Sequence, residues 1–361
     1  MRPSLLLRAH SLIASHDLSA MSDFPLDFTR AHGAPLAEAF FRREPEDFIV
    51  DEKLAAPPSG EGEHICVQVR KASQNTQWVA KQLAKFCGVK NRDVGYCGLK
   101  DRHALTTQWF SICLPKEAPD DWQEFEKQFP QNCVKVLQHI RHNKKLRPGD
   151  HQYNAFIIRV YPNQRGLENF EKRFNTIKNS GVPNYFGEQR FGIEGGNLIE
   201  ADKLFSSWTP QKHKKMPSII ISAARSYLFN LVLSNRVKHG DWQQVVDGEV
   251  SNNGAQSPNG PLWGRGRSLA QMPLLQRETE VLDRFESWRE ALEHCGLSQE
   301  RRDLLLLPDN MYYKRDEGLV EFGFRLPPGS YATSVLREFF VLKNSSGARS
   351  ESSGERGELN A

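Results

Sequence analysis

The sequence has no long apolar run and no paired cysteines, and each absence excludes a class of protein. No segment approaches the ~18 consecutive apolar residues that a membrane-spanning helix needs, and no pure run is longer than four residues, the length of the leucine run at 304–307. None of the six cysteines forms a C-x-x-C pair, and their spacings match no zinc-site template. Most of them lie in apolar stretches, which predicts free thiols in a reducing compartment, hence the cytoplasm.

A strong overall charge is missing as well. The formal net charge is only +4 over 361 residues, so any attraction to nucleic acid must come from local basic patches. Bulk disorder is excluded, because 21 Phe and 7 Trp supply ample apolar surface for a core. The length predicts about two globular domains.

The two ends of the chain do not look like folded structure. Residues 1–20 contain Arg, Ser and Leu with no acid before Asp17, which faintly resembles a transit peptide; an over-long gene model before Met21 is equally open. We expect residues 1–21 to be a disordered extension. Residues 344–361 contain Ser, Gly, Arg and Glu without aromatics, which predicts a disordered tail.

The region up to residue 180 alternates strands and helices. Alternating apolar residues predict strands within 48–70, and a helix follows that Asn75 or Thr76 can cap. Strands at 94–97 and 106–112 flank a polar turn at 98–103, and residues 153–161 form another strand.

From Gly181 to about Leu307 the pattern changes to mostly helical. We expect helices at 222–238, 278–294 and 301–306. The sequence pattern again predicts a strand at residues 318–326. The sequence therefore predicts an inserted helical domain at 181–307, within a core made of residues 22–180 and 308–343.

Residues 134–167 carry most of the local positive charge. Seven basic residues are opposed by Asp150 alone, so the net charge of this segment is +6, more than that of the whole chain. This is a candidate surface for RNA phosphates, with these candidate contacts: Arg141, Lys144, Lys145 and Arg147.

Asp101 is the first candidate catalytic residue. It lies on the polar turn between two strands, flanked by Lys100 and Arg102, and nearby cations favour the charged form of a carboxylate. An ionised carboxylate on a rigid hairpin can act as nucleophile or base. A charged turn held by local salt bridges explains the same pattern.

Asn154 and Phe156 lie two residues apart on a strand and so share a face beside the basic segment. An amide and an aromatic ring on one face suit a flat base, which the amide can bind at its edge and the ring by stacking. Phe156 as an ordinary core residue is equally open.

Two further stretches are rich in glycine and aromatics. Residues 184–192 (NYFGEQRFG) include Arg190, and they indicate a backbone that passes close to something, either phosphate or a second lobe. Residues 329–334 (GSYATS) fit a helix cap or the rim of a pocket.

Together these stretches resemble one family, the TruD-type tRNA pseudouridine synthases. The matching segments occur in the family's order and span residues 42–338: PEDF at 45–48, GLKDRHA at 98–104, KLR at 145–147, NAF at 154–156, VPNYFG at 182–187, QRFG at 189–192, SAARS at 222–226, LFN at 228–230 and GSYATS at 329–334. Each string alone is a weak signal, but the ordered set is specific.

The resemblance implies a fold and a substrate. The fold is α+β, with a bent, mostly antiparallel sheet, flanking helices and an inserted, mainly helical domain. The substrate is a transfer RNA whose uridine 13, in the D-arm, becomes pseudouridine. The resemblance implies no cofactor and no metal, and we expect a monomer without an obligatory protein partner and without membrane association.

The resemblance also implies roles for single residues. Asp101 falls on the family's catalytic aspartate, Asn154 on the asparagine near the target uridine and Phe156 on its companion ring. Phe48 falls on the pocket aromatic of the first motif.

Two positions depart from the family's usual residues. Tyr331 stands where Phe is usual, so its hydroxyl needs a partner or water. Arg42 stands where many members have Lys, which keeps the charge but changes its geometry.

Two other functions remain open at this point. A non-catalytic RNA-binding protein would use the basic segment and the aromatics without needing Asp101. A pseudouridine synthase for another RNA site would keep the same pocket and differ mainly in the insert.

Overall fold

The computed structural model describes residues 24–115, 119, 121–130, 133–164, 166–208, 216–250 and 257–345. The predicted extension at 1–21 lies outside the described residues, as does nearly all of the predicted tail. The tail's first residue, Asn344, is the last residue of a strand.

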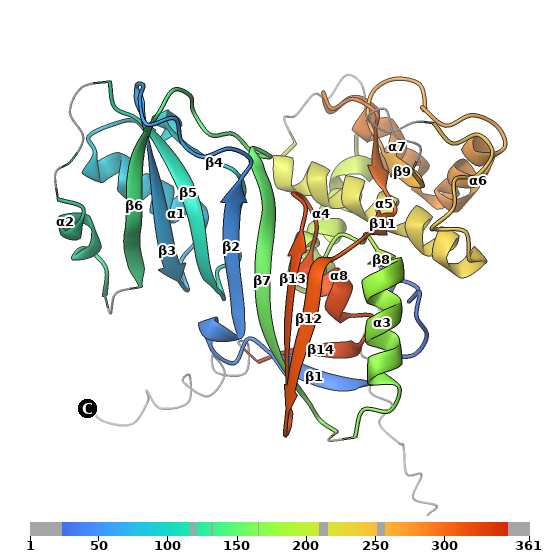
Figure 1. Cartoon of the computed structure of the whole chain (residues 1–361). Coiled ribbons are helices and arrows are strands. Elements are labelled where there is room, and N and C mark those ends of the chain that lie inside the picture. The colour runs from blue at the N-terminus through green and yellow to red at the C-terminus, as the bar shows by residue number, and fades with distance from the viewer. Residues whose placement is uncertain are drawn as a thin grey trace, which may run out of the picture.

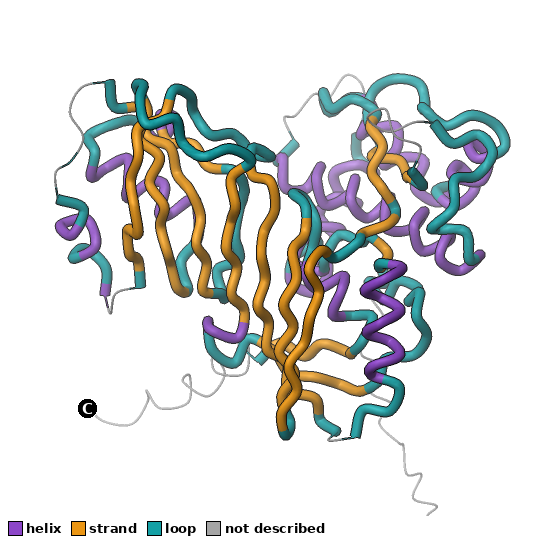
Figure 2. Tube along the Cα trace, in the orientation of Figure 1, coloured by secondary structure: helices purple, strands orange, loops and turns teal. Residues whose placement is uncertain are grey.

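A mixed sheet runs through the middle of the molecule (Figures 1 and 2). Its strands follow the order β12 (Asp309–Asp316), β13 (Leu319–Leu326), β7 (His151–Pro162), β2 (Phe48–Leu54), β5 (Leu105–Cys113), β3 (His64–Ala72) and β6 (Val134–His142). Three further strands join it: β1 (Ala37–Phe41), β4 (Val94–Tyr96) and β14 (Phe340–Asn344).

Most neighbours in this sheet are antiparallel. Only the β2–β5 and β1–β14 pairs are parallel among the described strands. The predicted α+β class with a mostly antiparallel sheet is therefore confirmed.

Helices pack against both halves of the sheet. Helix α1 (Thr76–Phe86) buries Val79 and Leu83 in a cluster with β3 and β5 residues, and the Asn75 side chain caps it by accepting from the Gln77 amide at 2.8 Å. Helices α3 (Phe170–Ser180) and α8 (Ala332–Leu336) bury their apolar faces with β13. A short α2 (Gln123–Glu126) lies beside β6.

A second lobe contains the helices α4 (Gly196–Ser206), α5 (Ser218–His239), α6 (Leu274–Val281) and α7 (Glu286–Glu293), at the upper right of Figure 1. One buried apolar cluster joins α4, α5 and α7, with Tyr227 and Trp288 among its members. Phe24 and Phe28, from the start of the described chain, pack into this same cluster. Among the described residues no helix has the length and apolar content that a membrane crossing requires.

One predicted helix is wrong. Residues 301–306 form strands β10 (Glu300–Asp303) and β11 (Leu305–Leu306), which pair with β9 (Asn259–Leu262) and β8 (Val182–Pro183). A short leucine-rich run fits a buried helix and a buried strand equally well, and partner strands remote in sequence decide between them.

One further helical prediction needs correction, and one helix is absent from the predictions. The helix predicted at 278–294 is two helices, because the chain turns through a short 3-10 segment, Asp283–Phe285, that buries Phe285. Helix α4 was not predicted at all.

Candidate active site

The facing strands β2 and β7 build a row of buried residues on one face of the sheet. Val50 pairs with Phe156 and Glu52 with Asn154 across the two strands, and Phe48 lies two residues before Val50. Residues that alternate along a strand share a face, and residues paired across strands share it too. Two aromatics, an amide and a carboxylate therefore line one strip of the sheet.

Hydrogen bonds to helix α1 and strand β5 hold the turn that carries Asp101. The hydroxyl of Thr76, in the first turn of α1, accepts from the main-chain amide of Lys100 at 3.0 Å and donates to Gln108 Oε1 at 2.8 Å. Gln108 Nε2 donates to the Gly98 carbonyl at 3.3 Å. The residues before Asp101 are thus tied to α1 and β5, which makes the hairpin rigid.

Asp101 pairs with Arg42 in the structure. Arg42 Nη2 donates to Asp101 Oδ2 at 2.7 Å, and the Arg42 guanidinium lies over the Phe48 ring, 4.5 Å from its centroid. Arg42 has a left-handed backbone with φ of 57°. That conformation costs a non-glycine residue about 1–3 kcal/mol, and such strain concentrates at functional sites.

A second carboxylate nearby is closed off from solvent. Glu52 Oε2 accepts from Lys100 Nζ at 2.5 Å, and Glu52 Oε1 accepts from the Trp109 amide at 3.0 Å. The Glu52 side chain is 0% exposed, whereas that of Asp101 is 31% exposed. Of the two carboxylates, only Asp101 can meet a reactant.

The cations around these carboxylates include a buried lysine. Lys71 lies on β3 and donates from Nζ to the Gln74 carbonyl at 2.7 Å. Burial, helped by the charge of Lys100, lowers the pKa of Lys71 to about 8, while Asp101 acts to raise it. Arg42 pairs directly with Asp101, and Lys71 and Lys100 add further positive charge to its surroundings.

Phe48 and Phe156 meet edge to face, with ring centroids 6.1 Å apart, and Phe156 also contacts Phe324. Phe48 is 2% exposed beneath Arg42, so in this structure its ring supports the guanidinium. A direct contact of either ring with substrate stays a prediction.

Asn154 is buried beside Phe156 on β7. Its Nδ2 lies 3.0 Å from His151 Nε2, while its Oδ1 is buried and has no hydrogen-bond partner within the described part of the chain. An unpaired buried carbonyl is costly unless something else meets it.

Tyr331 and Arg190 form a second group. Tyr331 follows β13, whose last residue, Leu326, pairs with Asn154, so its loop leaves the sheet next to the site. Arg190 Nη2 donates to the Tyr331 hydroxyl at 2.7 Å, and its Nη1 donates to Ser222 Oγ of α5 at 3.0 Å.

The Tyr331 hydroxyl, for which the sequence indicated no partner, therefore has one. Arg190, predicted to contact RNA, uses several of its guanidinium N–H groups in these hydrogen bonds. A Cβ on Gly187 would come within 2.9 Å of the Tyr331 ring, so the glycine-rich run passes close to a second loop.

The predicted basic contacts lie on β6 and on the loop that precedes β7. Lys144 and Arg147 are exposed. Arg141 Nη1 donates to the Leu114 carbonyl at 2.5 Å, and Lys145 Nζ donates to the Arg92 carbonyl. This loop leads directly into His151 and Asn154, which places positive charge beside the site.

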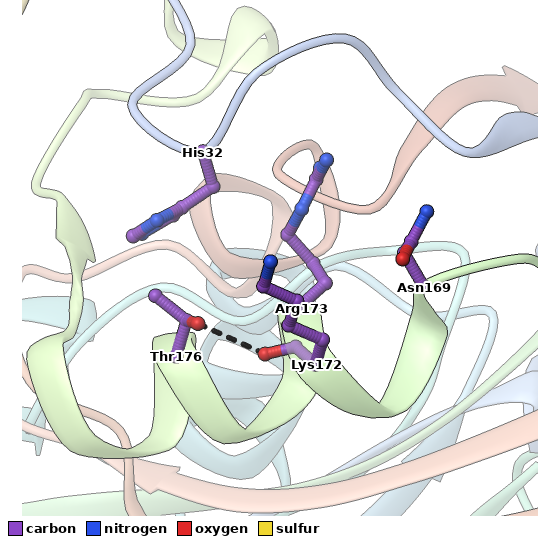
Figure 3. Close-up of a pocket in the computed structure, with 5 residues that line it drawn as sticks. All are labelled: His32, Asn169, Lys172, Arg173 and Thr176. Atoms are coloured by element: carbon purple, nitrogen blue, oxygen red, sulfur yellow. Dashed lines mark hydrogen bonds between the residues drawn. The ribbon is translucent and has the colours of Figure 1, made fainter.

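A cavity of about 400 Å³ lies elsewhere, between α3 and the N-terminal segment (Figure 3). Its lining residues are His32, Asn169, Lys172, Arg173 and Thr176. No carboxylate lines it, and the Arg173 guanidinium is held by the Glu338 and Ala34 carbonyls. It does not offer the chemistry of the Asp101 region.

Glu52, Cys97 and His151 have ligand atoms within 4.8 Å of one another, as a metal site would require. Both Glu52 oxygens are taken by Lys100 and the Trp109 amide, however, and a buried ammonium is a poor neighbour for a cation. These residues fit a hydrogen-bonded support better than a metal centre.

Several supporting residues were missed from the sequence. Glu52 gave a signal, because it interrupts the apolar face that Phe48, Val50 and Leu54 form. Gln108 gave none, and Thr76 was indicated only as a possible helix cap, since the residues that these two side chains contact are remote in the sequence. His151 gave none, because an irregularity in the pairing of two strands places it beside Asn154.

An accessible carboxylate held by an arginine, above an aromatic ring and beside a basic loop, is an arrangement suited to nucleophilic or general-base chemistry. Comparisons with known proteins identify the family. A family model described as tRNA pseudouridine synthase D (TruD) matches residues 31–200 and 249–339. The chain therefore belongs to the TruD family of tRNA pseudouridine synthases.

Curated relatives cover nearly the whole chain. The tRNA pseudouridine synthase D of Cellvibrio japonicus (strain Ueda107) is 49% identical over 328 residues, which cover 90% of this chain and 95% of the relative. The protein of the same name from Methylococcus capsulatus (strain ATCC 33009 / NCIMB 11132 / Bath) is 42% identical, covering 86% and 94%.

A solved structure supports the fold. A crystal structure of a Methanosarcina mazei protein described as a tRNA pseudouridine synthase D superposes with a TM-score of 0.56 and 23% identity, covering 87% of this chain and 94% of that chain. At this identity the likeness shows the fold alone.

The Tyr331–Arg190 bond predicts a stability effect. Tyr331→Phe removes the acceptor of two Arg190 N–H groups and is expected to lower the free energy of unfolding by about 1–2 kcal/mol. Urea unfolding measures this, with Tyr312→Phe, an exposed tyrosine on β12, as control. A Tyr331→Phe protein as stable as the parent would contradict the role of the bond.

Proposed function

We propose that this chain isomerises uridine 13 in the D-arm of transfer RNA to pseudouridine, with the Asp101 carboxylate starting the reaction. Its family membership supports the reaction and the substrate class. The observation that carries the assignment of Asp101 is its accessibility: it is partly exposed and paired with Arg42, while the side chain of the neighbouring Glu52 is fully buried.

The reaction needs the target base outside the RNA stack. Extruding a nucleotide costs a few kcal/mol, which contacts to the backbone can offset. The exposed Lys144 and Arg147, on the loop leading into β7, are suited to bind phosphates near the flipped base. Arg141, Lys145 and Arg190 are proposed RNA contacts too.

The chemistry exchanges one bond for another. The bond between N1 of uracil and C1′ of ribose breaks, the detached uracil turns within the pocket, and a new bond forms between C5 and C1′. The proton on C5 is then released. Asp101 can start this sequence by acting on the sugar, on the ring or as a base, and each route needs its ionised form.

The pocket residues have distinct proposed tasks. Arg42 orients Asp101, and Asn154 fixes the orientation of the uracil edge. Phe156 and Tyr331 are proposed to hold the uracil ring. Phe48 packs against both the Arg42 guanidinium and the Phe156 ring and is proposed to support them.

We also propose that residues 181–307 are a domain inserted into the catalytic core. The β8–β11 pair supports this, because it joins Val182 to Leu306 and so brings the two ends of the segment together. The insert is proposed to contact the RNA outside the pocket. A monomeric state and a cytoplasmic location stay predictions.

The role of Asp101 predicts a loss of activity without a loss of binding. Asp101→Asn is expected to reduce tritium release from tRNA carrying 5-tritiated uridine by at least about a thousandfold, because the amide can act neither as base nor as nucleophile. Binding of tRNA should be unchanged. Asp51→Asn, an exposed neighbour on β2, serves as control and should keep full activity.

The same assay tests the site in the RNA. Transfer RNA with cytidine at position 13 should release no tritium, whereas release from it would favour another uridine. Full activity of Asp101→Asn would overturn the catalytic assignment. Binding without any tritium release by the parent enzyme would favour the non-catalytic alternative.

The basic loop predicts a salt-dependent effect on binding. Replacing both Lys144 and Arg147 with alanine should weaken tRNA binding about tenfold near physiological salt and reduce the salt slope by about 1.5, because each phosphate contact contributes about 0.7–0.9. Filter binding across a salt series measures both quantities. The control replaces Lys172 and Lys178, exposed on α3 at the other end of the sheet. Equal losses in both double variants would rule out a specific role for this loop.

A further inference from the structure

A bulge in the sheet directs His151 toward the active-site asparagine. The residues His151 and Asn154 are three apart, so on a regular strand their side chains would point to opposite faces. The register shifts between Lys53 and Leu54, where Tyr153 pairs with Lys53 and His151 pairs with Leu54. The extra residue, Gln152, places His151 on the face of Asn154, and bulges of this kind commonly re-aim side chains next to active sites.

The side chains of His151 and Asn154 are in contact through only one of the two polar atoms of the Asn154 amide. Asn154 Nδ2 and His151 Nε2 are 3.0 Å apart, and both residues are buried. The amide can only donate from Nδ2, so Nε2 must be the acceptor, which requires a neutral ring with its proton on Nδ1. Two buried atoms are then without a partner in the described part of the chain: the Asn154 Oδ1 acceptor and the protonated His151 Nδ1.

We propose that His151 is a positioning residue for the isomerisation: its neutral Nε2 holds the Asn154 carboxamide so that Oδ1 accepts the N3–H of the flipped uracil. This inference rests on the proposed function. A protonated His151 would present N–H at Nε2, and the amide would have to turn its oxygen toward the ring. The Asn154 NH₂ group would then face the N3–H group of uracil. Two donors cannot form a hydrogen bond, so productive binding of the base would be lost.

An acceptor on N3–H suits this reaction for a geometric reason. Exchanging N1 for C5 is a half-turn of uracil about the axis through N3 and C6, and this turn interchanges the two carbonyl groups. N3 lies on the axis and stays in place. Asn154 Oδ1 can therefore keep the same hydrogen bond before, during and after the turn, as a pivot.

The surroundings of His151 favour its neutral form. The groups that face it are Glu52 on β2, Cys97 and Lys100 from the turn before β5, and Asp150 next to it in the chain. Burial, followed by the Lys100 charge, lowers the pKa of His151 below its ordinary value, although Glu52, the Cys97 main chain and Asp150 act in the opposite direction. The ring is therefore neutral at physiological pH and becomes charged only in acid.

The pH dependence of activity tests the proposal. The kcat for tritium release by the parent enzyme should fall at acid pH along a single-proton curve with its midpoint below 6.5, the ordinary histidine value. His151→Gln supplies an amide oxygen that accepts but does not titrate in this range. It should keep at least about a third of the activity at pH 8 and lose the acid fall between pH 5 and 7.

Two more variants complete the design. His151→Leu removes the acceptor and should lower kcat about tenfold at pH 8, with tRNA binding unchanged. His142→Gln replaces another buried histidine whose pKa burial also lowers, and it should keep the acid fall. An acid fall that persists unchanged in His151→Gln, or full activity in His151→Leu, would overturn the proposal.

A measurement on the unchanged protein guards against a variant that fails to fold. In ¹⁵N-histidine spectra of the full chain at pH 8, the His151 signals should show a proton on Nδ1 and none on Nε2. A proton on Nε2 would overturn the proposal whatever the variants do. Failure of the proposed function is recognised separately, as absence of tritium release by the parent enzyme at pH 8.

Discussion

The proposed chemistry depends on one contact, the ion pair between Arg42 and Asp101. It holds an accessible carboxylate in one position and places a positive charge beside it. Arg42 reaches this position only through a left-handed backbone residue at the end of β1, and its guanidinium rests on the Phe48 ring. The strained backbone of Arg42 and the packing of its guanidinium on Phe48 thus both support the contact with Asp101.

The second carboxylate helps to support the turn from which Asp101 makes this contact. Glu52 and Lys100 form a buried pair directly beneath the Asp101 turn, and the Trp109 amide satisfies the remaining Glu52 oxygen. Removing either partner of such a buried pair typically costs about 3–5 kcal/mol. The turn therefore has a rigid base, while Asp101 at its tip remains available to a substrate.

The sequence predicted what local patterns and motif order can carry. Strand-like segments were predicted at 94–97, 106–112 and 153–161, and the choice of Asn75 or Thr76 as a cap located the start of α1, where the structure has Asn75. The leucine run near residue 305 was misread, because strands remote in sequence decide its structure. The contacts of Thr76 and Gln108 could not be predicted for the same reason. The contact of His151 with Asn154 depends on the bulge at Gln152, which is set by pairing with β2 and has no local sequence signature.

Replacing Arg42 tests the central claim most directly. Arg42→Met should lower kcat for tritium release at least about a hundredfold, as misplacement of a catalytic group does, with the dissociation constant for tRNA unchanged. Arg42→Lys should recover most of the loss, since it restores the charge. If Arg42→Met folds, binds tRNA and keeps kcat within about threefold of the parent, the ion pair does not position the catalytic carboxylate, and the account fails.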